Sequence, residues 1–273
     1  MDRKILESFI DWDDAFDNSG YVDDSEGIRA NWAARAAKAR TTFTGHVGVS
    51  YGPDPRQAFD LFMPEGTPLG LVVFIHGGYW HLMGRAYFSH LARGPLAHGW
   101  AVAVVEYPLA PQARIADITA SIAQAVKAAA AQVAGPIRII GHSAGGHLAA
   151  RMACADGPLG SLVTRLDRVV AVSGVFDLLP LLATQMNDTL RLDVAEARAE
   201  SPARLLPDPS VPVTFYVGAD ERPEFLRQNR LCAERWGRSG GEVSTVYEPA
   251  RHHFDVVDSL EYPDGALTRA LLA

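Results

Sequence analysis

The sequence predicts an α/β fold in which helices lie on both faces of a doubly wound, mostly parallel sheet. From residue 69 onward, short apolar runs alternate with helix-forming segments, a pattern typical of repeated strand–helix units. The run 69–75 is apolar on both of its faces, as expected of a strand that helices cover on each side. The 273 residues, 48% of them hydrophobic, favour a single domain spanning 1–273 over two small ones.

The chain before this alternation is expected to supply a helical extension and the edge of the sheet. Residues 1–43 form the extension, in which 28–40 should be a helix with Trp32 as its anchor. Residues 45–51 and 57–63 alternate well enough to be two strands, and a Gly-Pro-Asp-Pro turn separates them. Because that turn is short, we expect the two strands to form an antiparallel N-terminal edge.

The rest of the chain is expected to alternate strands and helices with short connections, which implies right-handed crossovers and a parallel sheet. The stretch 175–207 departs from this pattern, because it lies between two core strands and is longer than an ordinary crossover. We interpret it either as a small cap over the strand ends or as a long crossover. The expected helices are 87–98, 115–133, the segment after Ser143, and 223–237; the expected strands are 100–106, 137–140, 168–173, 211–217 and 243–247.

Composition and charge argue against several classes of partner. The net charge of −7 comes without a basic stripe, so we expect no nucleic-acid partner. No segment is long and apolar enough to span a membrane, and the N-terminus lacks the apolar region of a secretory signal. Cys154 and Cys232 are too few for a disulfide framework and are expected to be buried thiols. We therefore expect a cytoplasmic protein without a cofactor or a membrane partner, and the oligomeric state stays open, with a homodimer among the alternatives.

The strongest chemical signal is the stretch Gly141-His142-Ser143-Ala144-Gly145, which joins an apolar strand to a helix-forming segment. A Gly-x-Ser-x-Gly sequence between a strand and a helix predicts a nucleophile elbow, a strained turn that exposes the serine hydroxyl above the sheet. The two glycines lie where a side chain would clash with the crossing strand and helix. Ser143 is therefore the candidate nucleophile, and the alternative is a glycine-rich turn with a surface serine.

A second glycine-rich turn follows the 69–75 strand, in the sequence His76-Gly77-Gly78-Tyr79-Trp80. Acyl transfer requires hydrogen-bond donors aimed at the oxygen that becomes negative in the tetrahedral intermediate. We expect an oxyanion hole made by the backbone N–H groups of Gly78, Tyr79 and Ala144. Tyr79 and Trp80 are candidates for lining a substrate pocket, or are packing residues, and His142 is a further pocket candidate.

The general base and its acid should follow the serine, because this architecture orders its triad as serine, acid, histidine. Downstream of the elbow, His252 and His253 come directly after the last expected strand. Asp220 and Glu221 come just after the strand before it, and spacing does not choose between them. A His-His pair can also indicate a metal, but no further Cys/His cluster accompanies it, so we expect no metal site.

These residues resemble those of the α/β-hydrolases, and more narrowly those of the kynurenine formamidase (arylformamidase) branch and its bacterial esterase relatives. The resemblance covers nearly the whole chain, and the pairing of its Gly-Gly and Gly-x-Ser-x-Gly motifs is specific. It implies the α/β-hydrolase fold and serine chemistry. The residues that carry it are Trp32, 76–80, 141–148, Met186-Asn187, Glu196-Ala197, Ser201-Pro202 and His253-Phe254.

The resemblance also bears on the two pairs that spacing leaves open. Members of the family carry an acid, two variable residues and then Glu-Phe, a pattern that falls on Glu221 here. It therefore favours Glu221 over Asp220 as the acid, although eukaryotic members usually have Asp in this place. The family histidine directly precedes a phenylalanine, which favours His253 over His252 as the base.

Together these inferences predict a serine hydrolase that cleaves a small ester or an N-formyl or aryl amide, similar to kynurenine formamidase. The first alternative is a general short-chain carboxylesterase or thioesterase. The second, from a different class, is a binding protein that has kept a hydrolase scaffold without its catalysis.

Overall fold

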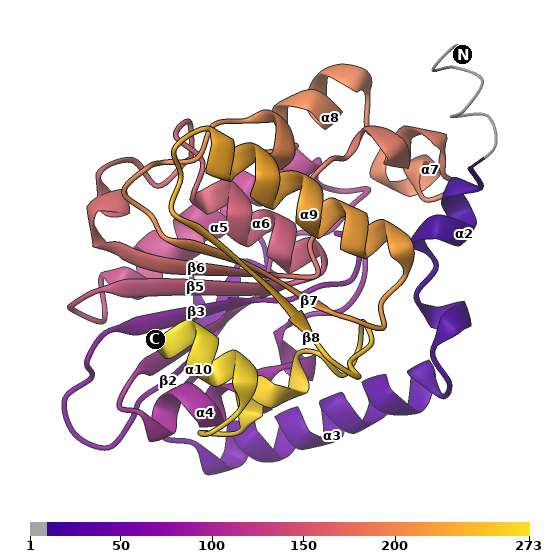
Figure 1. Cartoon of the computed structure of the whole chain (residues 1–273). Helices are drawn as coiled ribbons and strands as arrows, with labels where there is room; N and C mark the ends of the chain where they lie inside the picture. Colours follow the sequence, from indigo (N-terminus) through magenta and orange to yellow (C-terminus); the bar gives the residue numbers. More distant parts are fainter. Residues whose placement is uncertain (1–9) are drawn as a thin grey trace.

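The computed structural model describes residues 10–273, so residues 1–9 of the expected extension lie outside it. Its centre is an eight-stranded sheet with the strand order β1-β2-β4-β3-β5-β6-β7-β8 (Figure 1). The pairs from β4 through β8 are parallel, whereas β2 pairs antiparallel with both β1 and β4. The predicted mostly parallel sheet with an antiparallel N-terminal edge is therefore confirmed. The strands are β1 (Gly45–Ser50), β2 (Ala58–Phe62), β3 (Leu71–Ile75), β4 (Ala101–Val105), β5 (Ile137–His142), β6 (Leu166–Val172), β7 (Val213–Gly218) and β8 (Val243–Glu248).

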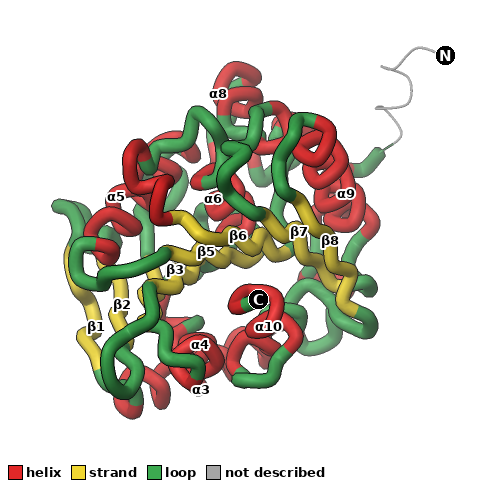
Figure 2. Tube along the Cα trace, turned by 60° about the vertical axis from the view of Figure 1, so that its left-hand side comes forward, coloured by secondary structure: helices red, strands yellow, loops and turns green. Residues whose placement is uncertain are grey.

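Helices cover both faces of this sheet, as Figure 2 shows. The alternation of side chains along β3 explains why: Val73 and Ile75 enter one hydrophobic core, and Val72 and Phe74 enter the other. The first face carries α5 (Ile115–Ala130), α6 (Ala144–Met152) and α9 (Pro223–Arg238), and the second carries α3 (Ser25–Thr42), α4 (Arg93–Ala97) and α10 (Ala266–Leu272).

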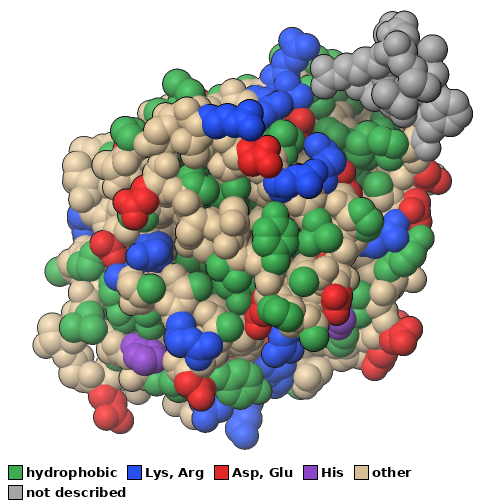
Figure 3. Space-filling model, in the orientation of Figure 1, with side chains coloured by type: hydrophobic (Ala, Val, Ile, Leu, Met, Phe, Trp, Pro, Cys, Tyr) green, Lys and Arg blue, Asp and Glu red, His purple; other side chains and the backbone are tan. Residues whose placement is uncertain are grey.

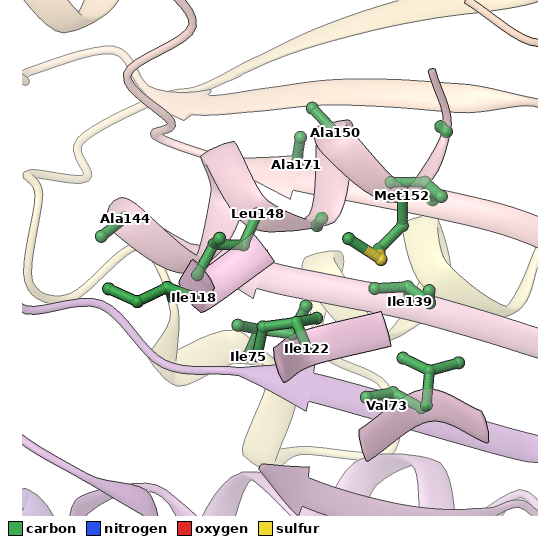
Figure 4. Close-up of a cluster of buried hydrophobic side chains, with 14 of the residues drawn as sticks. Val73, Ile75, Ile118, Ile122, Ile139, Ala144, Leu148, Ala150, Met152 and Ala171 are labelled. Atoms are coloured by element: carbon green, nitrogen blue, oxygen red, sulfur yellow. The ribbon is translucent and has the colours of Figure 1, made fainter. Parts of the chain in front are cut away.

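The core on the first face fixes α5 and α6 above the central strands. Figure 4 shows Ile75 and Ile139 of the sheet close to Ile118 and Ile122 of α5, with Leu148 and Met152 of α6 beside them. All six are at most 1% exposed. Burying a side chain of this size stabilises the fold by about 1.5–3 kcal/mol, so α6 is held firmly against β3 and β5.

The expected helix 87–98 is the main departure from the predicted elements. The structure has two 3₁₀ turns, η2 (Arg85–Tyr87) and η3 (Ser89–Ala92), and then only the short helix α4. Pro95 explains the break, because proline cannot donate a backbone hydrogen bond and clashes with the preceding turn of a helix. In α4, Pro95 is the third residue, a position at which a backbone N–H would have no partner within the helix in any case.

The long stretch between β6 and β7 consists of short helical pieces. They are η5 (Leu179–Ala183), α7 (Asn187–Leu190), α8 (Val194–Ala199) and η6 (Pro202–Arg204). The Asn187 side chain closes the loop after α7 by accepting from the Leu192 N–H at 2.9 Å and donating to the Leu192 carbonyl at 3.2 Å. The Gln185 N–H donates to Asp13 Oδ1 at 2.8 Å, which joins this stretch to α2 (Trp12–Phe16) near the N-terminus.

On the face drawn in Figure 3, basic and acidic side chains are interspersed. Within residues 10–273, none of the helices combines the length and the apolar character that crossing a bilayer requires.

Trp32 attaches the N-terminal helix α3 to the C-terminal part of the chain. Its ring is 1% exposed and packs against Phe88 and Phe254. Its indole Nε1–H donates to Asp258 Oδ1 at 3.1 Å, in the 3₁₀ turn η7 (Asp258–Glu261). Arg35, one turn further along α3, forms ion pairs with both Asp258 and Glu261.

We therefore expect Trp32→Ala to lower the free energy of unfolding by about 3–5 kcal/mol, because it removes a large buried ring and a hydrogen bond. Urea unfolding followed by circular dichroism measures the change. Trp12→Ala is the matched control, since Trp12 is only half-buried, and it should cost much less. An unfolding midpoint for Trp32→Ala equal to that of the wild type would contradict this role.

Candidate active site

Ser143 occupies the turn between β5 and α6, with φ 57° and ψ −121°. This positive φ is a strained conformation for serine, as expected at a nucleophile elbow. The glycines on either side make the turn sterically feasible. A Cβ on Gly141 would lie 1.9 Å from the Gly145 carbonyl oxygen, and a Cβ on Gly145 would lie 2.0 Å from the Ile75 carbonyl oxygen. Strand β3, strand β5 and helix α6 therefore meet too closely for any side chain at these two positions.

Glu221 and His253 form a buried hydrogen-bonded pair at the ends of two neighbouring strands. Glu221 follows β7 and His253 follows β8, and His253 Nδ1 lies 2.7 Å from Glu221 Oε2. The other carboxylate oxygen accepts from the Gly218 N–H at 3.0 Å and from the Ser173 hydroxyl. These donors hold the carboxylate in one orientation, so it can in turn fix the imidazole.

The alternative acid and base lie in different environments. Asp220 is exposed, and its backbone N–H donates to the Arg251 carbonyl. His252 is about one-third exposed, and its Nδ1 accepts from the backbone N–H groups of Phe254 and Asp255 at 3.2 Å. The structure therefore brings Glu221 and His253 together and leaves Asp220 and His252 outside the pair.

The turn after β3 presents free backbone donors beside Ser143. A Cβ on Gly77 would lie 2.9 Å from Ser143 Cβ, and Gly78 and Tyr79 have φ values of +110° and +45°. Ala144 is the first residue of α6, where the N–H has no acceptor within the helix. Among residues 10–273, the N–H groups of Gly78, Tyr79 and Ala144 have no acceptor. They are available to an oxygen of a bound substrate.

A cavity of about 350 Å³ opens over these groups. Ser143, His142, His253, Gly78 and Tyr79 all line it. The remaining wall comes from four other parts of the chain and is largely apolar and aromatic. Its residues include Phe16, Asn18, Arg29 and Trp32 near the N-terminus, Leu82 and Met83, Thr184, Met186 and Thr189 from the stretch between β6 and β7, and Phe254.

Trp80 takes no part in the cavity, which corrects the expectation that it lines the substrate pocket. Its side chain is fully buried in the core and packs edge-on against His147 of α6, to which its Nε1–H donates at 3.3 Å. Tyr79 does line the cavity, and its hydroxyl donates to the Phe16 carbonyl at 2.5 Å. Both residues have positive φ, so the backbone turns sharply here and sends the two neighbouring side chains to different places.

The BD-FAE family model matches residues 59–226, a range that includes the Gly-Gly turn, the elbow and Glu221. The chain belongs to the BD-FAE family. Kynurenine formamidase from Salmo salar is 29% identical to it over 237 residues, which are 83% of this chain and 80% of that protein.

Solved structures share the fold of this chain. A crystal structure of a candidate thioesterase from Silicibacter sp. TM1040 has a TM-score of 0.91 and 41% identity, covering 97% of this chain and 100% of that one. An esterase from Pyrobaculum calidifontis has a TM-score of 0.68 at 18% identity, covering 98% and 96%, and this likeness concerns the fold alone. The resemblance to α/β-hydrolases is thus confirmed, and this BD-FAE chain is a hydrolase of the α/β-hydrolase type.

The two histidines that flank the elbow are buried and neutral. Burial lowers the pKa of His142 and of His147 to about 3. His142 Nε2–H donates to the His253 carbonyl at 2.8 Å, and His147 Nε2–H donates to the Glu200 carbonyl at 2.6 Å. His147 therefore fixes the core beneath the site, whereas His142 holds the loop that carries His253.

Several residues around the site of this BD-FAE chain were not predicted. Ser173 holds Glu221, and its only sequence signal is that it is a polar residue directly after a core strand. Asn18 donates to the Tyr79 hydroxyl at 3.3 Å, and nothing in the sequence indicates that its segment reaches the cavity. Glu196 and Ser201, which carry part of the family resemblance, instead hold the stretch between β6 and β7 through Arg114 and the Leu178 N–H.

Within residues 10–273, no three His, Cys, Asp or Glu side chains are grouped to hold a metal ion.

Glu221→Gln should lower kcat on p-nitrophenyl acetate by about 10³- to 10⁴-fold, because an amide can neither hold the productive imidazole tautomer nor stabilise the imidazolium. The matched control is Asp220→Asn, which should keep activity close to that of the wild type. Thermal unfolding of both variants would separate a catalytic loss from a folding defect. A larger loss in Asp220→Asn than in Glu221→Gln would contradict the assignment of the acid.

Proposed function

We propose that this α/β-hydrolase cleaves a small ester or an N-formyl or aryl amide through an acyl-Ser143 intermediate. Ser143 Oγ attacks the carbonyl carbon while His253 accepts its proton, and His253 then donates that proton to the leaving group. Glu221 orients His253 and stabilises its charged form. The N–H groups of Gly78, Tyr79 and Ala144 bind the oxyanion, and water then hydrolyses the acyl-serine.

The observation that carries this proposal is the buried contact between His253 and Glu221 in the cavity that also contains Ser143. A carboxylate accepts only, so His253 Nδ1 must carry a hydrogen when neutral. Its Nε2 is then left with a lone pair, which is what a general base for a serine hydroxyl requires.

The size and the lining of the cavity support a compact aromatic substrate. Its volume of about 350 Å³ lies at the small end of ligand pockets. Phe16, Trp32 and Phe254 offer aromatic surfaces to an aryl group. The similarity to kynurenine formamidase favours an aryl formamide such as N-formylkynurenine. The similarity to the Silicibacter candidate thioesterase supports the alternative, a general carboxylesterase or thioesterase.

A substrate panel tests both parts of the proposal. We expect N-formylkynurenine to give a higher kcat/KM than p-nitrophenyl acetate or an acetyl thioester, since the aromatic wall suits an aryl formamide. Ser143→Ala is the control and should lower kcat by at least about 10³-fold on every substrate that is cleaved.

Two results would each reject a different part of the proposal. Turnover of p-nitrophenyl acetate with N-formylkynurenine left intact would reject the formamidase function and leave the carboxylesterase one. Near-native turnover by Ser143→Ala would reject the acyl-serine mechanism itself.

A further inference from the structure

His142 presents an unused hydrogen-bond acceptor to the catalytic cavity. Its side chain is 3% exposed and lines the cavity next to Ser143. Its Nε2 lies 2.8 Å from the His253 carbonyl oxygen, which can only accept, so Nε2 must carry the hydrogen. Within residues 10–273, the only side-chain hydrogen bond of His142 is the one made by Nε2, so Nδ1 has no partner there.

The position of Nδ1 is close to the reacting centre. A Cβ on Gly77, at the oxyanion turn, would lie 3.5 Å from this nitrogen and 2.9 Å from Ser143 Cβ. The rings of His142 and His253 lie 4.8 Å apart between centroids, and both line the cavity that also contains Ser143. Because burial keeps His142 neutral, Nδ1 offers a lone pair even when His253 is protonated.

Amide cleavage creates a need for such an acceptor, whereas ester cleavage does not. In the tetrahedral intermediate formed from a secondary amide, the nitrogen lone pair must point at the proton on His253 Nε2. The N–H bond then points elsewhere, and when substrate binding removes its hydrogen bond to water, the protein must supply another acceptor or the hydrogen bond is lost. When the proton moves from His253 Nε2 to the substrate nitrogen, the C–N bond breaks. The amine then leaves, and acyl-Ser143 remains. An ester oxygen carries no such hydrogen.

We propose that His142 Nδ1 accepts the scissile N–H of the substrate and thereby selects secondary amides, such as aryl formamides, over the corresponding esters. This inference rests on the proposed acyl-serine function and narrows its substrate class. His142 is then a specificity-determining residue, whose second nitrogen also holds the His253 loop.

Two variants of His142 each remove the hydrogen-bonding role of one ring nitrogen and keep that of the other. The amide nitrogen of glutamine can take the place of Nε2, so His142→Gln keeps the donor to the His253 carbonyl and loses the acceptor at the Nδ1 position. Asparagine reaches only as far as Nδ1, so His142→Asn keeps an acceptor there and loses the bond to the His253 loop.

The substrates are 4-nitroformanilide and 4-nitrophenyl formate, which differ only by N–H in place of oxygen, with spontaneous hydrolysis subtracted. In His142→Gln, kcat/KM for the anilide should fall about ten- to a hundredfold more than kcat/KM for the ester, mainly through kcat. In His142→Asn, both substrates should lose activity while the ratio of anilide to ester stays near the wild-type value.

An equal loss on both substrates in His142→Gln would overturn the inference and leave the proposed serine hydrolase intact. Cleavage of the ester but not of the anilide by the wild-type enzyme would also overturn the inference. Should His142→Gln not fold, a fall in the ratio for His142→Asn would overturn the inference, and a preserved ratio would support it. Cleavage of neither substrate by the wild type would reject the proposed function, and the inference with it.

Discussion

The candidate active site depends on how closely β3, β5 and α6 approach one another at Ser143. The Ile75 carbonyl oxygen lies where a side chain of residue 145 would have to go, and the Gly145 carbonyl lies where one of residue 141 would have to go. Glycine at both positions permits this contact, and Ser143 between them has the positive φ that is expected of a nucleophile elbow. The same contact brings the Gly-Gly turn after β3 against the serine, so one packing constraint positions both the candidate nucleophile and its candidate donors.

A chain of hydrogen bonds then joins this point to the ends of the neighbouring strands. Ser173 after β6 holds Glu221 after β7, and Glu221 holds His253 after β8. The His253 carbonyl accepts from His142 at the end of β5, which closes the chain back at the elbow. Because parallel strands end at the same edge of the sheet, residues far apart in sequence can form one network. The whole network is buried, so each member depends on the others for its orientation.

The sequence was sufficient for those parts of the molecule that local patterns encode. The elbow is a continuous motif, and the alternation of apolar runs with helical segments predicted the mostly parallel sheet and its antiparallel edge. Side-chain direction within a strained turn was not predictable. The sequence therefore could not show that Tyr79 lines the cavity whereas the adjacent Trp80 is buried in the core. The N-terminal wall of the cavity was not predictable either, because Phe16 and Asn18 reach it only through tertiary contacts. The helix expected at 87–98 was wrong because tertiary context and Pro95 outweighed a helix-forming composition.

The central claim is that the environment of Ser143 makes its hydroxyl a nucleophile. Reaction of the folded protein with a fluorophosphonate probe, followed by peptide mass spectrometry, tests it most directly. The account predicts one adduct, on Ser143, that forms in the wild type and is strongly slowed in His253→Gln. An unlabelled Ser143 in the folded wild type, or equally fast labelling in His253→Gln, would contradict it.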